Sequence, residues 1–182
     1  MDDVIEIQEG FLKRLFKEVL NEEISLPLPR ITYEEAMERY GSDKPDTRFG
    51  FELVKLNELV KNCSFGVFTN ALSAGGDVRG ITIEGGSAQF SRKDIDKMQD
   101  SLKAYGAKGL VWIRHGGNEI TSSINKFFSQ EELHALLTEM NAKEGDLCLI
   151  VADKPKIVFD ALGFLRRDIA KRMGLLDDSK HN

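Results

Sequence analysis

The spacing of apolar residues changes near residue 50, and this change constrains the fold more than any other feature of the sequence. Before it, apolar side chains recur every three or four residues, which is the period of a helix that buries one face. After it, short apolar runs alternate with glycine and polar residues, which is typical of strands. We therefore expect a helical segment over residues 1–50 and a unit with its own sheet from residue 51 onward.

The first 50 residues predict two helices and a polar loop. Residues 3–20 carry apolar side chains at helical spacing, namely Val4, Ile5, Phe11, Leu12, Leu15, Phe16, Val19 and Leu20. The prolines of residues 26–29 predict an extended segment, because proline fixes φ and restricts its predecessor. Thr32 begins a capping-box pattern, and Gly41 would end the short helix that follows. Residues 42–46 then form a loop that contains two carboxylates, a lysine and a proline.

The rest of the chain predicts an α+β unit. Its expected strands are residues 51–56, 67–72, 78–84, 110–114 and 147–152, and its expected helices begin at Ser91, Ser129 and Asp153. Gly75, Gly76 and Asp77 indicate a hairpin between the second and third strands. Because strands come in hairpins with few helices between them, we expect a two-layer arrangement, an antiparallel sheet with helices on one face.

The charge of the chain does not favour strong RNA binding. It carries 30 acidic and 25 basic residues, a net charge of -5, whereas dedicated nucleic-acid binders are usually basic. Four cations nevertheless cluster in the last turns of the last expected helix: Arg166, Arg167, Lys171 and Arg172. They either complement the helix dipole or make weak contacts with an RNA phosphate backbone.

Several site classes have no support in the sequence. Cys63 and Cys148 lie in apolar runs, no CxxC is present and neither cysteine is near a histidine, so we expect no metal site. The glycine clusters match neither phosphate-binding fingerprint, and no nucleophile pairs with a histidine by motif. No apolar run approaches the ~20 residues of a membrane span. The acidic N-terminus does not resemble a signal peptide, so we expect a cytoplasmic protein.

One segment resembles a known family closely. TYEEAMERYGSDKPDTRF, residues 32–49, resembles the segment that follows motif 2 in bacterial aspartyl-tRNA synthetases. Upstream, Glu9–Leu20 resembles a helix of the catalytic core of that family. Downstream, Phe90–Met98, Ile124–Ser129 and Ala161–Leu175 resemble its inserted domain. The resemblance covers essentially the whole chain.

The resemblance implies a class II aminoacyl-tRNA synthetase. Such an aspartate–tRNA ligase activates aspartate with ATP and Mg²⁺ and then transfers it to tRNA. The full protein would be a homodimer with an anticodon-binding barrel and a catalytic antiparallel sheet. The inserted domain of this family is a GAD domain, similar to one in the archaeal tRNA-dependent amidotransferase. Its implied fold is DCoH-like, antiparallel strands and helices in two layers.

On this basis the chain is expected to be a fragment of the ligase. Residues 1–50 would be a flank of the catalytic core, 51–176 the inserted domain and 177–182 a tail. The family's motif 2 arginine lies upstream, and motif 3 and the aspartate-recognising arginine lie beyond residue 182. We therefore carry over no catalytic residue and no cofactor to this chain, and expect it to be inactive. The nearest candidates are Ser42, Asp43, Lys44 and Asp46, which would lie towards the active site.

Two other functions compete with this one. The chain could be the tRNA-binding module of an amidotransferase, or a free-standing dimerisation domain; the flank over residues 32–49 favours the ligase. The apolar face of residues 4–20 needs a partner, so the fragment could self-associate there, while the loop over residues 42–46 should be open to solvent. The sequence does not say what the inserted domain does, or whether tRNA-Asn is also charged.

Overall fold

The computed structural model of the chain describes residues 2–116 and 119–176. Backbone contacts divide the chain into two compact units, Met1–Thr32 and Tyr33–Asn182. The β-sheet and both hydrophobic cores belong to the second unit. No helix in the described part of the chain is long and apolar enough to cross a membrane.

The first unit is a helix followed by an extended segment. α1 (Asp2–Leu15) continues into a short π-helical turn, η1 (Phe16–Leu20), which confirms the helix expected over residues 3–20. Its covered side is mixed: Glu9 is 8% exposed and accepts a hydrogen bond from the backbone N–H of Leu28, 3.1 Å away, and Ile5 and Leu12 on the same side are half-buried. Other apolar side chains are exposed, Phe11 by 64% and Val19 of η1 by 69%.

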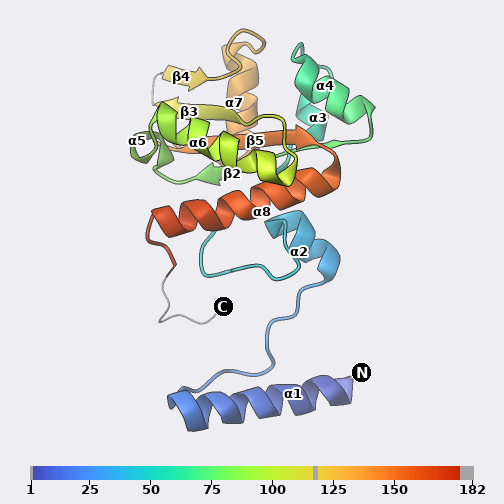
Figure 1. The fold of residues 1–182 in the computed structure, drawn as a ribbon, viewed down its shortest axis with the longest axis vertical. Helices are drawn as coiled ribbons and strands as arrows, with labels where there is room; N and C mark the ends of the chain where they lie inside the picture. The colour runs from blue at the N-terminus through green and yellow to red at the C-terminus, as the bar shows by residue number, and fades with distance from the viewer. Residues whose placement is uncertain (1, 117–118, 177–182) are drawn as a thin grey trace. The chain divides into compact units, whose positions relative to one another are not determined.

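The second unit is built on one antiparallel sheet. Its strands are β1 (Val54–Lys55), β2 (Asp77–Ile83), β3 (Val111–Gly116), β4 (Glu119–Ser122) and β5 (Leu147–Asp153). Their order in the sheet is β1-β2-β5-β3-β4, and every neighbouring pair is antiparallel (Figure 1). β5 lies in the middle and pairs with β2 along seven residues of each strand. The predicted α+β class with an antiparallel sheet is confirmed.

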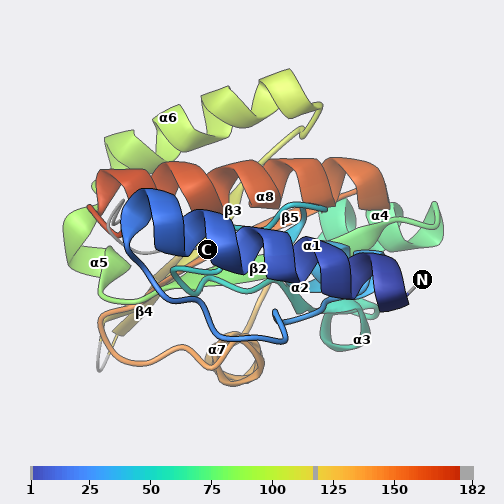
Figure 2. The same ribbon diagram turned by 90° about the horizontal axis from the view of Figure 1, so that it is seen from below.

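Helices cover both faces of this sheet. α6 (Arg92–Leu102) and α8 (Pro155–Arg172) share a core with one face, and α3 (Asn57–Val60), α4 (Gly66–Ser73) and α7 (Gln130–Glu139) share a core with the other (Figure 1 and Figure 2). The expectation of helices on one face only is therefore wrong. Its physical reason is in the central strands: Ile81 of β2 belongs to the first core and Val78 to the second. A strand that is apolar on both sides needs a cover on both sides.

Two predicted strands are also wrong. Residues 67–72 belong to α4, so no hairpin forms at Gly75 and Gly76. Phe65, Phe68 and Leu72 all pack into the second core, and their spacing is that of a helix. Gly76 then joins α4 to β2, where a Cβ atom would lie 2.6 Å from the carbonyl oxygen of Asp153.

The first expected strand, residues 51–56, is reduced to the two residues of β1. Phe51 has a φ of 61°, which turns the chain away from the sheet. The N–H of Leu53 donates to the carbonyl of Arg39, 2.8 Å away, rather than to β2.

The helix starts that rest on local signals are confirmed. Ser91 and Asp94 form a reciprocal capping box at the start of α6, and Ser129 and Glu132 form one at the start of α7. Gly106, with a φ of 85°, follows the short helix η2 (Lys103–Tyr105) that continues α6. These signals act within one turn of chain, so they need no knowledge of the tertiary fold.

Candidate functional site

Arg166 of α8 is a buried anchor for the chain that precedes the sheet. Its side chain is 1% exposed. The guanidinium Nε donates to the carbonyl of Phe51 at 2.8 Å, and Nη2 donates to the carbonyls of Gly50 at 2.9 Å and Asp46 at 3.3 Å. The buried charge is therefore satisfied by hydrogen bonds to three backbone oxygens.

Two aromatic rings flank the same guanidinium. Tyr40, in α2 (Tyr33–Tyr40), lies 4.7 Å from it and Phe49 lies 5.0 Å from it. Burial lowers the pKa of Arg166 to about 10, so the group stays a cation at neutral pH. A contact between Arg166 and an RNA phosphate, one of the two roles considered for the basic cluster, is therefore wrong for this residue. Its side chain is buried, and its guanidinium donates hydrogen bonds to backbone carbonyls.

Arg79 of β2 anchors α2 in the same way. Its side chain is 2% exposed, and it pairs with Asp77 at 2.9 Å and with Glu38 of α2 at 2.7 Å. Its guanidinium also lies 4.8 Å from the ring centre of Phe159. Burial works to raise the pKa of the Asp77 carboxyl, but hydrogen bonds from Arg79 and Asn57 outweigh it and lower the pKa. No sequence motif marks either buried arginine.

The loop over residues 42–46 is partly open, as expected, and partly fixed. Asp43 and Lys44 are exposed, whereas Ser42 and Asp46 are half-buried. The Asp46 carboxylate accepts from Arg48 through Nε at 3.0 Å and Nη2 at 2.8 Å. These hydrogen bonds hold the pKa of Asp46 below its usual range. The loop is thus fixed at its C-terminal end and exposed at its tip.

Two glycines bring the start of this loop against α8. Gly41 has a φ of 66°, and a Cβ atom there would lie 2.5 Å from the carbonyl oxygen of Phe159. A Cβ atom on Gly163 of α8 would lie 2.5 Å from the carbonyl oxygen of Gly41. Neither contact tolerates a side chain without a shift of the backbone. The loop is therefore held beside the outer side of α8.

The two groups of candidate residues meet at a hollow of about 560 Å³ on this side of α8. We call it the α8 hollow; among its lining residues are Ser42, Tyr105, Asp160, Phe164, Arg167, Asp168 and Lys171. Ser42 comes from the loop and Arg167 and Lys171 come from the helix, and no pattern along the chain places them together. Asp43, Lys44 and Asp46 are not part of its lining.

Charges in the α8 hollow are unevenly paired. Asp168 forms an ion pair with Arg172 at 2.7 Å, and Asp160 forms one with Lys156 at 2.6 Å. Arg167 and Lys171 are exposed, and neither forms an ion pair with any residue in the described ranges. The hollow therefore presents two cations without a close ion pair among the described residues, although the charge of Arg167 helps to lower the pKa of Asp46, while Asp160 and Asp168 each pair with another cation.

The hollow also has an aromatic wall. The rings of Tyr105 and Phe164 stack, with centroids 4.8 Å apart and planes inclined by 29°. Tyr105 is still 38% exposed. Neither ring was predicted to belong to a site, because the two belong to different helices and become neighbours only in the folded chain.

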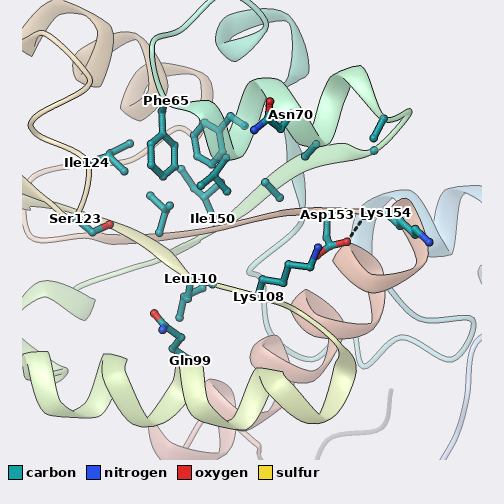
Figure 3. A pocket seen from close by; sticks show the side chains of 18 residues that line it. Phe65, Asn70, Gln99, Lys108, Leu110, Ser123, Ile124, Ile150, Asp153 and Lys154 are labelled. Carbon is teal, nitrogen blue, oxygen red and sulfur yellow. Dashed lines mark hydrogen bonds between the residues drawn. The ribbon is translucent and has the colours of Figure 1, made fainter.

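A second cavity, also about 560 Å³, lies between α4 and the ends of β3 and β5. Figure 3 shows apolar side chains such as Phe65, Ile124 and Ile150 at one end and Lys108, Asp153 and Lys154 at the other. This cavity is absent from the predictions made from the sequence, because residues 67–72 were predicted to be a strand and not a helix. The helical spacing of Phe65 and Phe68 was the signal that could have revealed it.

The described residues contain no group of three or more histidine, cysteine, aspartate or glutamate side chains placed to hold a metal ion.

A family model for the GAD domain matches residues 68–162, just over half of the chain. The chain belongs to the GAD domain family. The match covers the sheet from β2 to β5 and the first eight residues of α8, so it includes Tyr105 and Asp160 of the α8 hollow. Ser42, which precedes the match, and Phe164, Arg167 and Lys171, which follow it, lie outside the matched residues.

Relatives of this GAD domain protein match far more than the domain. An aspartate–tRNA ligase of Ruminiclostridium cellulolyticum is 52% identical over 97% of the chain and 30% of its own length. An aspartate–tRNA ligase of Agathobacter rectalis is 52% identical over 100% of the chain and 30% of its own length. An aspartate–tRNA(Asp/Asn) ligase of Lachnoclostridium phytofermentans is 50% identical, with the same coverage. The chain thus spans about 30% of the length of these relatives.

Proposed function

We propose that this chain is part of an aspartate–tRNA ligase and supplies its inserted, non-catalytic GAD domain together with a flank of the catalytic core. The observation that carries this proposal is the extent of the similarity. The ligases match 97–100% of the chain at about half identity, whereas the GAD domain accounts only for residues 68–162. A protein that shared the GAD domain alone, as expected for an amidotransferase, would leave the flank unmatched.

The activity of the full protein follows from this proposal. It would activate aspartate with ATP and Mg²⁺ and transfer it to tRNA, as a cytoplasmic homodimer. Class II chemistry relies on charged groups positioned around the adenylation transition state. We assign those groups, and the sites for ATP and Mg²⁺, to parts of the ligase outside this chain. Within the chain, we propose that the loop with Ser42, Asp43, Lys44 and Asp46 lies nearest to the active site.

A chimera tests the ligase assignment. The matching segment of the Ruminiclostridium cellulolyticum ligase would be replaced by this chain, and aspartate charging of tRNA-Asp would be measured beside the parent enzyme. We expect the chimera to charge tRNA within about tenfold of the parent, because a half-identical segment preserves the packing that holds the catalytic groups. A folded, dimeric chimera without activity would contradict the proposal. The isolated chain should show no aspartate-dependent pyrophosphate exchange.

We also propose that Arg167 and Lys171 contact the phosphate backbone of tRNA, with Arg172 in a lesser role because Asp168 already neutralises it. The support is their exposure and lack of ion pairs in the described chain. With a net charge of -5, the isolated chain should bind tRNA weakly and with strong salt dependence. A salt titration that showed tight binding at physiological ionic strength would argue against so small a contact.

A further inference from the structure

We propose that the α8 hollow binds one unpaired nucleotide of RNA, with the base stacked beside Tyr105 and the adjoining phosphates held by Arg167 and Lys171. The inference rests on the proposed ligase function for the presence of RNA, and it goes beyond that function by naming the kind of RNA element and the residue that selects it. Three features of the hollow support it: its ring, its charge and its size.

The ring is the feature that distinguishes a nucleotide from a bare phosphate. Phe164 stacks on Tyr105 and so fixes the plane of the ring, which lowers the entropy lost when a base stacks against it. Tyr105 keeps 38% of its surface exposed and contributes to the lining of the hollow. Bases stack on exposed aromatic side chains only when they are unpaired and splayed out, because duplex bases stack on each other.

The charge favours an anion. Arg167 and Lys171 lie four residues apart on α8, so they project from the same side of the helix. Both are exposed and neither has an ion-pair partner within residues 2–116 and 119–176. The lining also contains the carboxylates of Asp160 and Asp168. Lys156 and Arg172 form ion pairs with them, which reduces their repulsion of an anionic ligand.

The size favours one residue of a single strand. A volume of about 560 Å³ lies in the range of roughly 300–1,000 Å³ that small-molecule sites occupy. A duplex is far wider than such a hollow and could touch only its rim. Ser42, also in the lining, accepts from the N–H of Lys44 and can donate its own hydroxyl proton to a base or a phosphate oxygen. The hollow therefore fits a nucleotide whose base leaves the strand.

The test compares single-stranded and double-stranded RNA on the full 182-residue chain. Two fluorescein-labelled RNAs would be titrated with the chain by fluorescence anisotropy at two salt concentrations. One is a single-stranded tetranucleotide. The other is a blunt-ended hairpin whose loop is a non-nucleotide linker, so that it offers no unpaired base. Free nucleoside monophosphate would serve as competitor. We expect the tetranucleotide to bind more tightly than the hairpin, and the monophosphate to compete weakly, since it offers one phosphate rather than several.

Substitutions then separate stacking from charge. Tyr105→Phe should leave the affinity for the tetranucleotide within about twofold, whereas Tyr105→Leu should lower it about five- to a hundredfold. Replacing Arg167 and Lys171 together by glutamine should reduce the slope of log K against log salt by about 1.4, the equivalent of two single-strand phosphates. Lys61→Gln is the control. It removes an exposed lysine at the end of α3, on the other face of the sheet, and should leave both the affinity and its salt dependence unchanged.

A spectroscopic variant keeps the test decisive if Tyr105→Leu fails to fold. Tyr105→Trp in a Trp112→Phe background places a single fluorophore in the hollow, and a stacked base should quench it. Equal binding of hairpin and tetranucleotide, equal affinity of the leucine and phenylalanine variants, or no quenching would overturn the proposal. If the chimeric ligase charges tRNA while these results are negative, the nucleotide site fails and the ligase function stands.

Discussion

α1 and α8 are both amphipathic helices, yet only α8 buries its apolar residues fully. α8 buries Val158, Leu162 and Ile169 completely and exposes cations such as Lys171. α1 exposes Ile7 by 73% and Phe11 by 64%, and the one residue it buries is the acidic Glu9. Residues 28–30 cover the side of α1 that contains Glu9. The N–H of Leu28 donates to the Glu9 carboxylate, and the guanidinium of Arg30 lies 3.8 Å from the same carboxylate.

The difference shows what an apolar period can and cannot predict. The period states that one side of a helix avoids water, but the partner surface must come from elsewhere. α8 finds its partner in the sheet of its own unit, whereas the unit with α1 contains a helix and an extended segment alone.

Two deletions separate the units. Removing residues 1–32 should leave the free energy of unfolding of the rest unchanged, because both hydrophobic cores lie in residues 33–176. Removing residues 1–50 should cost about 3–5 kcal/mol, since it removes the buried rings of Tyr40 and Phe49 that cover Arg166, together with two of the carbonyls that Arg166 bonds. Urea unfolding followed by circular dichroism measures both. Equal stability of the two products would support the domain boundary after residue 50 that the sequence predicts.

Adjacent arginines on α8 provide a finer comparison. Arg166→Met should destabilise the chain by about 2–4 kcal/mol, because three partly buried hydrogen bonds from the guanidinium to backbone carbonyls are lost. Arg167→Met, one residue further on the exposed side, should change stability by less than about 0.5 kcal/mol. The same urea titration distinguishes them, and similar losses for both variants would show that the burial of Arg166 is not what stabilises this region.

Acid should weaken the second unit through its ion-paired carboxylates. Asp77 has a folded-state pKa below its ordinary value of 3.8, so its contribution to stability is present above that value and is lost as the pH falls through the folded-state pKa. Asp77→Asn should therefore flatten the fall in stability below about pH 4. Thermal unfolding at several pH values measures this slope; Glu131→Gln, an exposed carboxylate on α7, is the matched control.

Substitution on the apolar side of α1 should affect association and not folding. Replacing Phe11 and Val19 by serine should leave unfolding within about 0.5 kcal/mol, since both side chains are already exposed. We expect the same change to abolish self-association of the chain, which sedimentation at rising concentration would detect. Gln8→Ser, on the same helix, is the control. A strictly monomeric parent chain would show that exposure of this face is tolerated.

Local signals in the sequence determined a good part of this protein. The capping boxes at Ser91 and Ser129, the strands β2 and β5 and the helix stop at Gly41 all depend on residues within a turn or two of one another. The antiparallel sheet followed from the same patterns, and the resemblance of residues 32–49 to a synthetase core is supported by relatives that match the whole chain.

The tertiary structure alone decided where the helices lie and what the basic cluster does. Arg166 bonds to carbonyls 115 to 120 residues away, so the sequence around it does not show its partners. Helical spacing does separate it from Arg167, because Arg166 is four residues after Leu162 and three before Ile169, on the buried side of α8. The α8 hollow likewise joins a loop, η2 and α8, which meet because two glycines allow the loop to touch the helix. Burial and site geometry arise from contacts between distant segments, and a periodicity measured along the chain carries no information about those contacts.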